Sequence, residues 1–217
     1  MTTPALPAPR TLLFIGDSIT DCSRTEDPDG LGYGYVRLLA EHFAAHEPTA
    51  RVVNRGVSGN KVADLGARFT PDCLEHDPQV VTIYVGVNDA WHRFTQGEDQ
   101  RVSPQAFEEG YRFLLDQLSA TRPAAPVLMV LPFAVDVSEE IARLHEDLDE
   151  KVRIIRGLAR EFQHPVVDLE EVLQRSWTVG HTPPSIAGDG VHPTIAGHRL
   201  IADEWLATFA GVDRNGR

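Results

Sequence analysis

The sequence has few cysteines and no long hydrophobic run. Its 217 residues include only two cysteines, Cys22 and Cys73, and these form no CxxC pair. Such a pair marks many zinc and redox sites, so neither kind of site is predicted. The two thiols could form one disulfide, although two free thiols are the interpretation we favour. All apolar runs are far shorter than the roughly 20 residues of a membrane-spanning helix, so no membrane partner is expected.

The sequence also lacks the pattern of a secretory signal. The first ten residues, MTTPALPAPR, are rich in proline and alanine, and no basic start precedes an apolar stretch. Signal peptides need both features. We therefore expect a cytoplasmic protein, unless a signal was removed ahead of the first residue.

Positive charge is scarce. The chain has 20 Lys and Arg residues against 32 Asp and Glu residues, which gives a formal net charge of −12. Binding to nucleic acid or to an anionic membrane needs clustered Lys and Arg, so neither partner is expected. We attribute the acidity to solubility. The oligomeric state stays open, a homo-oligomer included.

What the sequence does contain is a series of short apolar runs. The central ones, VVTIYVG and VLMVLP, are apolar almost throughout, which is typical of strands buried on both faces of a parallel sheet. Five strands are predicted in this way, at Thr11–Asp17, Ala50–Arg55, Val80–Gly86, Pro126–Pro132 and Pro165–Leu169.

Longer segments with helical spacing separate these strands. The helices predicted are Tyr35–His46, Pro104–Thr121, Ser138–Gln163 and Thr194–Ala210. Alternating strands and helices imply right-handed crossovers, and so an α/β fold with a five-stranded parallel sheet between two layers of helices. We expect one domain over residues 11–210, with a flexible segment at residues 1–10 and a tail at residues 211–217.

Gly, Asn, Asp, Ser and His gather after the predicted strands and before the last helix. The segments are GDS at residues 16–18, NRGVSGN at 54–60, GVNDAW at 86–91 and GDGVHPTIAGH at 188–198. Ligands of parallel α/β folds bind at the carboxyl ends of the strands. The four segments are therefore expected to meet at one edge of the sheet.

These segments together supply the parts of an acyl-transfer site. Ser18 is the candidate nucleophile, His192 the candidate base, and Asp189, three residues earlier, the group that orients the base. An oxyanion needs hydrogen-bond donors. The candidates are the backbone N–H groups of Ser18 and Gly59 and the side-chain amide of Asn88.

Two neighbouring residues have alternative interpretations. Asp17 could contact the substrate, although a role in holding the Ser18 turn through backbone N–H groups is the interpretation we favour. Trp91 lies just after Asn88, where its ring could stack on a sugar or simply anchor a loop. Both are kept as candidate substrate-binding residues.

No metal or cofactor is predicted. His42 and His46 have the spacing of a helical metal pair, but an HExxH motif is absent and exposed helix histidines are commoner. His198 is expected to be a helix residue near the site rather than a second base. The glycine-rich GLGYGY at residues 30–35 lacks the GxGxxG spacing, so a flexible loop or the start of a helix is expected there.

The motifs GDSIT, NRGVSGN, GVND and DGVHP resemble the four blocks of the SGNH hydrolases, also called the GDSL esterase/lipase family. The family's name residues fall on Ser18, Gly59, Asn88 and His192, and its triad aspartate falls on Asp189. The resemblance runs from residue 12 to about residue 208. It implies a flavodoxin-like α/β/α sandwich, a serine nucleophile and no cofactor.

Within this family the chain is most similar to intracellular carbohydrate acetyl esterases of the acetylxylan type. The shared segments are FIGDSITDC, RVVN.G.SGN and VHP..AGH. Two positions depart from the pattern. Ile19 stands where the family label has leucine, and Gly188 stands where acetylxylan-type members have a tryptophan, so the acyl pocket is expected to differ.

The first hypothesis is accordingly a serine esterase that cleaves short acyl esters, most plausibly acetyl esters on small molecules such as carbohydrates. The second is a lipase, lysophospholipase or thioesterase with the same mechanism and longer acyl chains. A non-catalytic ligand-binding module on a flavodoxin-like fold is the rival from another class. Because every catalytic position is filled, we favour an enzyme.

Overall fold

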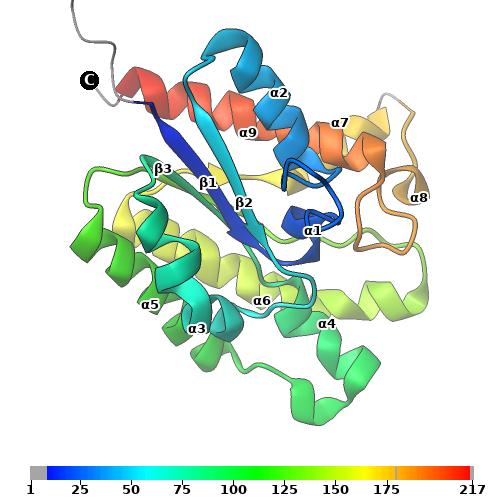
Figure 1. The fold of residues 1–217 in the computed structure, drawn as a ribbon. Helices are drawn as coiled ribbons and strands as arrows, with labels where there is room; N and C mark the ends of the chain where they lie inside the picture. The colour runs from blue at the N-terminus through cyan, green and yellow to red at the C-terminus, as the bar shows by residue number, and fades with distance from the viewer. Residues whose placement is uncertain (1–8, 179, 216–217) are drawn as a thin grey trace, which may run out of the picture.

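The carboxyl ends of five parallel strands lie along one edge of a single sheet in the computed structural model, which describes residues 9–178 and 180–215. The strand order is β2-β1-β3-β4-β5 (Figure 1). The chain therefore adds β2 on one side of β1 and the later strands on the other side. The strands are β1 (Thr11–Gly16), β2 (Arg51–Gly56), β3 (Val80–Tyr84), β4 (Val127–Val130) and β5 (Val166–Val167).

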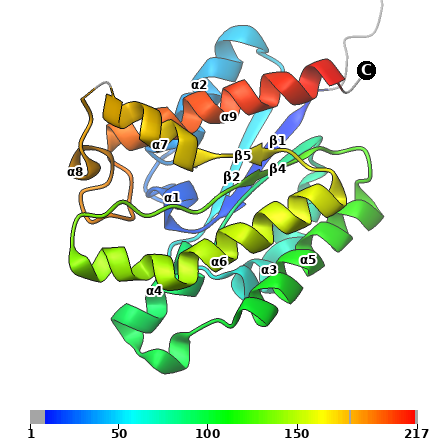
Figure 2. The same ribbon diagram turned by 180° about the vertical axis from the view of Figure 1, so that it is seen from behind.

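Helices cover both faces of the sheet. Three helices, α2, α7 and α9, lie on one face, and α3, α5 and α6 lie on the other (Figures 1 and 2). The longer helices are α2 (Tyr35–His46), α3 (Val62–Asp72), α4 (Val87–Gln96), α5 (Pro104–Thr121), α6 (Glu139–Phe162), α7 (Leu169–Thr178) and α9 (Ile195–Asn215). The short ones are α1 (Ser18–Asp21), α8 (Pro183–Ile186) and the 3₁₀ turns Leu74–His76 and Glu98–Gln100. The predicted three-layer α/β architecture is therefore confirmed.

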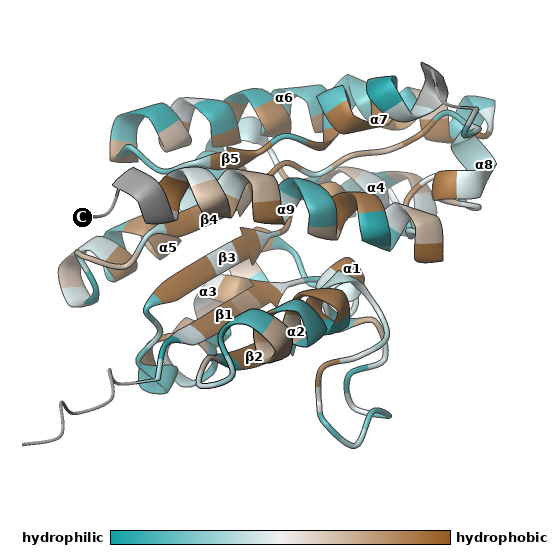
Figure 3. Cartoon of the chain, turned by 90° about the horizontal axis from the view of Figure 1, so that it is seen from above, coloured by the Kyte–Doolittle hydropathy of each residue, from teal (hydrophilic) through white to brown (hydrophobic). Residues whose placement is uncertain are grey.

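Burial on both faces explains why the strands are apolar throughout. Along β1, Leu12 and Phe14 face α2 and α9, whereas Leu13 and Ile15 face α3 and α5, and all four are fully buried. Figure 3 shows the hydrophobic strands at the centre and hydrophilic outer faces on the helices. Removing this apolar surface from water is the main term that stabilises such a sandwich.

The last helix is fixed to the middle of the sheet. Trp205 of α9 is fully buried, and its indole N–H donates to Thr82 Oγ1 of β3 at 2.9 Å. A buried indole N–H that found no acceptor would be costly. This bond and the packing of Phe14 against Trp205 therefore set the position of α9, which directly follows the predicted catalytic histidine.

Three of the longer helices were not predicted from the sequence, namely α3, α4 and α7. The first contains Gly66 and Pro71, which both disfavour a helix. The strands predicted at Val80–Gly86, Pro126–Pro132 and Pro165–Leu169 are shorter in the structure. The last of them, β5, keeps only Val166 and Val167. The glycine-rich segment at residues 30–35 leads into α2, with Gly34 at its N-cap.

The predicted end segments are placed only in part. Residues 1–8 of the segment expected to be flexible lie outside the described residues, and Arg10 is bonded to Glu47. The tail expected at residues 211–217 overlaps the end of α9, which continues to Asn215. Cys22 and Cys73 are both free, as expected. In the described part of the chain, no helix is long and apolar enough to span a membrane.

Candidate active site

The first strand delivers Ser18 to the carboxyl edge of the sheet. β1 ends at Gly16, and Ser18 begins α1 two residues later. The Asp17 carboxylate caps this short helix by accepting the Ile19 N–H at 3.0 Å, the usual function of an aspartate at an N-cap. Asp17 is fully buried, whereas Ser18 is partly exposed. The strand thus passes straight into a tight turn that presents the serine hydroxyl.

A second tight loop, between α8 and α9, carries the predicted base. One oxygen of Asp189, Oδ1, accepts the backbone N–H groups of Val191 at 2.9 Å and of His192 at 2.8 Å. An aspartate often closes a turn in this way. The loop is further held to the segment after β4, because Val135 N–H donates to the carbonyl of Gly190 at 2.9 Å.

These two turns bring Ser18, His192 and Asp189 into one chain of hydrogen bonds. Ser18 Oγ lies 2.9 Å from His192 Nε2, and His192 Nδ1 lies 2.7 Å from Asp189 Oδ2. Because a carboxylate can only accept, Nδ1 carries the proton and Nε2 is left as the acceptor that faces the serine. This geometry allows the imidazole to take the serine proton.

The carboxyl group of Asp189 stays ionised in this setting. Its partial burial would raise its pKa, but the hydrogen bonds from the His192 ring and from two backbone N–H groups outweigh that effect and lower the pKa below its ordinary value. Asp189 is therefore negative at neutral pH. A negative partner stabilises the imidazolium that forms when His192 takes a proton.

The loop after β2 brings Gly59 to the same edge. Gly59 has a φ of +81°, a left-handed backbone conformation that glycine adopts without strain, and nothing lies near the position of its missing Cβ. The loop is tied to α1 through Ser58, whose hydroxyl donates to Asp21 Oδ2 at 2.8 Å. The Gly59 N–H is thus held on a loop that is bonded directly to the helix that begins with Ser18.

Arg68 of α3 fixes the other side of this loop, and the sequence analysis did not identify it. Its guanidinium donates to Asn60 Oδ1 at 2.7 Å, to the carbonyl of Arg55 at 2.8 Å and to the carbonyl of Gly16 at 3.0 Å. One side chain therefore joins the ends of β1 and β2 to the Gly59 loop. The only sign of this role in the sequence was the position of the arginine next to an apolar residue, Phe69, which is buried in the structure.

Asn88 lies in the first turn of α4 and is almost fully buried. Its side-chain amide donates to the carbonyl of Asn60, with Nδ2 3.1 Å from the oxygen. A side-chain amide has two N–H groups, so this bond orients the amide and uses one of them. Asn60 thus links Asn88 to the loop of Gly59 and, through its own side chain, to Arg68.

Two buried aspartates flank these residues, Asp17 before Ser18 and Asp89 after Asn88. Burial raises the pKa of Asp17 to about 7. The negative charge of Asp89 also raises this pKa, whereas the hydrogen bond from the Ile19 N–H lowers it. Burial likewise raises the pKa of Asp89 to about 7, against the Val62 N–H bonds to both its oxygens. Asp17 is fully buried and its carboxylate accepts the Ile19 N–H within the turn, an arrangement that favours the structural interpretation over contact with a substrate.

Trp91 and His198 lie close to His192 but in different ways. The Trp91 ring is partly exposed, with its centroid 5.5 Å from that of the His192 imidazole. His198 was expected to be a helix residue near the site. It belongs to α9, and its side chain is buried. In the described part of the chain, no three His, Cys, Asp or Glu side chains are grouped so that they could hold a metal ion.

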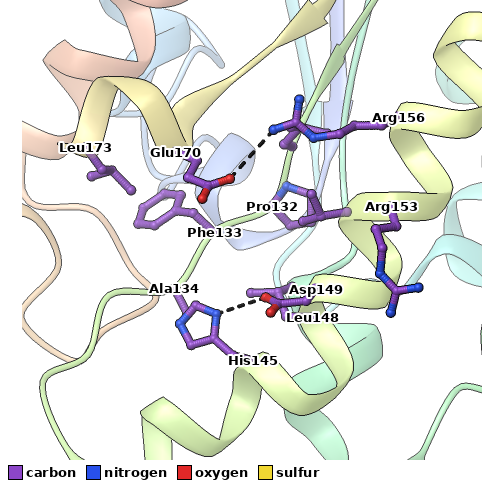
Figure 4. Close-up of a pocket in the computed structure, with 12 residues that line it drawn as sticks. Pro132, Phe133, Ala134, His145, Leu148, Asp149, Arg153, Arg156, Glu170 and Leu173 are labelled. Atoms are coloured by element: carbon purple, nitrogen blue, oxygen red, sulfur yellow. Dashed lines mark hydrogen bonds and ion pairs between the residues drawn. The ribbon is translucent and has the colours of Figure 1, made fainter. Parts of the chain in front are cut away.

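A cavity of about 460 Å³ lies between α6, α7 and the segment that follows β4 (Figure 4). Residues 131–134, which follow β4, form its apolar floor, and α6 and α7 form its walls. The charged groups around it are already paired, with Arg156 bonded to Asp168 and Glu170, and His145 bonded to Asp149. These paired groups therefore offer no free charge to a ligand in the cavity.

Comparison with known proteins supports the same family as the motifs. Residues 14–200 match the model of the GDSL-like lipase/acylhydrolase family. The chain is 34% identical to the acetylxylan esterase of Geobacillus stearothermophilus over 210 residues, covering 90% of this chain and 91% of that enzyme. It is 27% identical to thioesterase 1/protease 1/lysophospholipase L1 of Escherichia coli, covering 91% and 81% of the two chains.

Solved structures agree with this result. The structure of a variant of the Geobacillus acetyl xylan esterase Axe2 superimposes with a TM-score of 0.82 at 31% identity, covering 92% of this chain and 94% of the other. The family model spans both the Ser18 turn and the Asp189–His192 loop. The protein is therefore a carboxylic ester hydrolase, and it belongs to the GDSL-like lipase/acylhydrolase family.

Proposed function

We propose that this protein is a serine esterase that removes short acyl groups, acetyl above all, from small esters including acetylated carbohydrates. The observation that carries the proposal is the unbroken set of hydrogen bonds from Ser18 through His192 to Asp189, with distances of 2.9 and 2.7 Å. A nucleophile, its base and the orienting group are then within bonding distance before substrate binds.

In the proposed reaction, Ser18 Oγ attacks the ester carbonyl carbon while His192 Nε2 takes the hydroxyl proton. The tetrahedral intermediate collapses when the C–O bond to the alcohol breaks, and the imidazolium returns its proton to the leaving oxygen. Water, deprotonated by His192, then attacks the acyl-serine and releases the carboxylic acid and free Ser18. Asp189 keeps the proton of the resting imidazole at Nδ1 throughout.

The oxyanion is assigned to three donors, the N–H groups of Ser18 and Gly59 and the side-chain amide of Asn88. One contact supports this assignment directly. Asn88 is bonded to Asn60, which is the next residue after Gly59, so the amide and the loop are positioned together. Donors fixed in advance stabilise the developing negative charge without reorganisation, which is a large term in acyl transfer.

The acyl and alcohol groups are proposed from weaker support. The relative at 34% identity is an acetylxylan esterase, and the partly exposed Trp91 offers a ring on which a sugar could stack. Solved catalytic mutants of the Geobacillus enzyme replace a serine, an aspartate and a histidine, the last two three positions apart, as Asp189 and His192 are here. The Escherichia coli relative keeps thioester and lysophospholipid hydrolysis as the second candidate.

The test combines one substitution with a series of substrates. Ser18→Ala should abolish hydrolysis of p-nitrophenyl acetate and leave the circular dichroism spectrum unchanged, whereas retained turnover would contradict the assigned nucleophile. With the unmodified protein, p-nitrophenyl esters from C2 to C12 should give the highest kcat/KM at C2. A maximum at C8 or beyond would favour the lipase or thioesterase function instead, with the same triad. Acetate release from acetylated xylo-oligosaccharides tests the alcohol group.

A further inference from the structure

A buried histidine joins the three elements that surround the proposed triad. His198 lies in the first turn of α9, six residues after His192, and is 6% exposed. Its Nδ1 accepts the backbone N–H of Tyr35 at 3.2 Å, and its Nε2 lies 3.5 Å from Cys22 Sγ. Tyr35 begins α2, and Cys22 ends the turn that starts at Ser18. The function proposed above gives His198 no part.

The bond to Tyr35 replaces a missing helix cap. The first N–H groups of a helix have no partner within it and are usually satisfied by a side chain at the N-cap. The N-cap of α2 is Gly34, which has no side chain, and the imidazole of His198 takes its place from another helix. A Cβ on Gly34 would lie 2.7 Å from His198 Cε1. The glycine and the histidine therefore fit only as a pair.

The same contacts reach the nucleophile. The N–H of Cys22 donates to the carbonyl of Ser18 at 2.9 Å, and the Tyr35 hydroxyl lies 3.0 Å from Thr20 Oγ1, so both partners of His198 are bonded to α1. His198 N–H in turn donates to the carbonyl of Thr194, two residues after His192. A short path of hydrogen bonds therefore runs from the residue after the base loop to the serine.

We propose that His198 is a positioning residue, a neutral imidazole that caps α2 and holds the Ser18 turn in register with the loop that carries His192. This inference rests on the proposed roles of Ser18 and His192. Because Nδ1 accepts the Tyr35 N–H, the proton of His198 lies on Nε2, which donates to the Cys22 sulfur. A charged imidazolium could not accept the Tyr35 N–H, so this positioning role requires the neutral form of His198.

Two substitutions test whether the hydrogen bond to the Tyr35 N–H matters, or whether any polar side chain at position 198 is sufficient. In His198→Asn, the amide oxygen stands as far from the backbone as Nδ1 does, so it can still accept the Tyr35 N–H. In His198→Gln, the polar group is one methylene further away and the cap is lost. We expect kcat for p-nitrophenyl acetate to fall about 10- to 100-fold in the glutamine variant with KM unchanged, and to stay near the unmodified value in the asparagine variant.

The pH dependence of stability gives a readout other than activity. Burial and the neighbouring His192 lower the pKa of His198 to about 4, so between about pH 4 and 6.5 the unfolded chain binds a proton that the folded protein excludes. Stability from this group is therefore lost as pH falls through that window. Cys22, Tyr35 and His192 are the titratable groups that face it. The asparagine variant should lose less Tm than the unmodified protein on going from pH 6.5 to pH 4.5.

Equal kcat values in the glutamine and asparagine variants would overturn the inference, provided that Ser18→Ala is inactive. An active Ser18→Ala variant would instead overturn the proposed triad. If the glutamine variant does not fold, Gly34→Ala provides the second route, because its new methyl group displaces the imidazole without removing it. It should lower kcat with KM unchanged, and a kcat equal to that of the unmodified protein would contradict this positioning role.

Discussion

The two halves of the proposed active site are built in opposite ways. The nucleophile half is continuous with the core, since Asp17 and Thr20 on either side of Ser18 are fully buried and hydrogen-bonded to their surroundings. In the base half, a loop with a buried backbone turns its two functional side chains towards the surface. The side chains of Asp189 and His192 are 50% and 44% exposed, and the loop is shaped mainly by the Asp189 carboxylate itself.

This difference separates stability from turnover. Buried polar groups are costly to disturb because their partners are then left unsatisfied, so changes around Ser18 should affect folding. Exposed side chains contribute little to the free energy of unfolding, so changes of Asp189 or His192 that keep the hydrogen bonds of the loop should affect catalysis rather than stability. A substitution on the base half that unfolds the protein, or one on the nucleophile half that leaves its stability untouched, would break the comparison.

Asp189→Asn should have the largest effect. The asparagine oxygen can still accept the two backbone N–H groups, but its amide would donate to His192 Nδ1 and move the imidazole proton to Nε2, which faces the serine. The expected loss in kcat is of the order of 10⁴-fold, as for other triads with this change. The change in Tm should stay within about 2–4 °C, which corresponds to roughly 1 kcal/mol for a chain of this size.

Rate measurements and thermal melts on the same preparation decide this case. Because the loop geometry depends on Oδ1, Asp189→Ala is the matched variant that loses both functions of the side chain, and its Tm should fall further. The separation of the two halves would be wrong if Asp189→Asn melted far below the unmodified protein.

Gly188→Trp should have an intermediate effect and sharpen the account of the base half. Gly188 is exposed, and a Cβ there would meet only the carbonyl of Pro184, at 4.0 Å. The variant Axe2 structures carry substitutions at a tryptophan and at the catalytic aspartate that follows it. A large ring at this position should narrow the site and lower kcat/KM for C8 esters roughly 10-fold relative to C2 esters.

The control for this change is Gly188→Ala, which adds little volume and should leave the ratio of C8 to C2 hydrolysis unaltered. A tryptophan variant with the same ratio as the unmodified protein would show that position 188 does not limit the acyl group.

Asp17→Asn should have the smallest effect on kcat and instead change the pH dependence of stability. The pKa of Asp17 is raised to about 7, so the folded protein holds a proton that the unfolded chain releases above about pH 4. Stability from this group is therefore fully present below about pH 4 and is lost as pH rises from about 4 through about 7. The amide keeps the oxygen that caps α1 but does not ionise.

The measurement is Tm at several values from pH 5 to pH 8.5. The Tm of the variant should rise relative to that of the unmodified protein as pH increases. Asp116→Asn, on the exposed surface of α5, removes a charge outside the core and serves as control. Parallel Tm curves for Asp17→Asn and the unmodified protein would place the titration elsewhere.

The sequence alone predicted the sheet, four of the helices and the convergence of the site segments. Strands buried on both faces give short runs that are apolar throughout, and α2 and α5 have the apolar spacing of amphipathic helices, so these elements were recognisable. The proximity of Ser18 to His192 also followed, because both were placed at the carboxyl edge of a parallel sheet.

Other features could not be predicted because polar residues occupy buried positions. The first turn of α4 contains Asn88 and Asp89, which are buried for their hydrogen bonds rather than for hydrophobicity, so the apolar spacing of the helix is hidden. The contacts of Arg68 depend on how α3 packs against the ends of β1 and β2, and those of His198 on how α9 packs against α2. No local pattern carries that information.

The position of α9 has a consequence for the order in which the site is assembled during synthesis. Ser18 and His192 are separated by 174 residues, and at about 5–20 residues per second a ribosome needs on the order of ten to thirty seconds to make that stretch. The loop of His192 gains its support from α9, which the Trp205–Thr82 bond fixes to the sheet. On the proposed mechanism, the growing chain therefore contains Ser18 well before its base, and hydrolysis is expected to begin only when the last helix has docked.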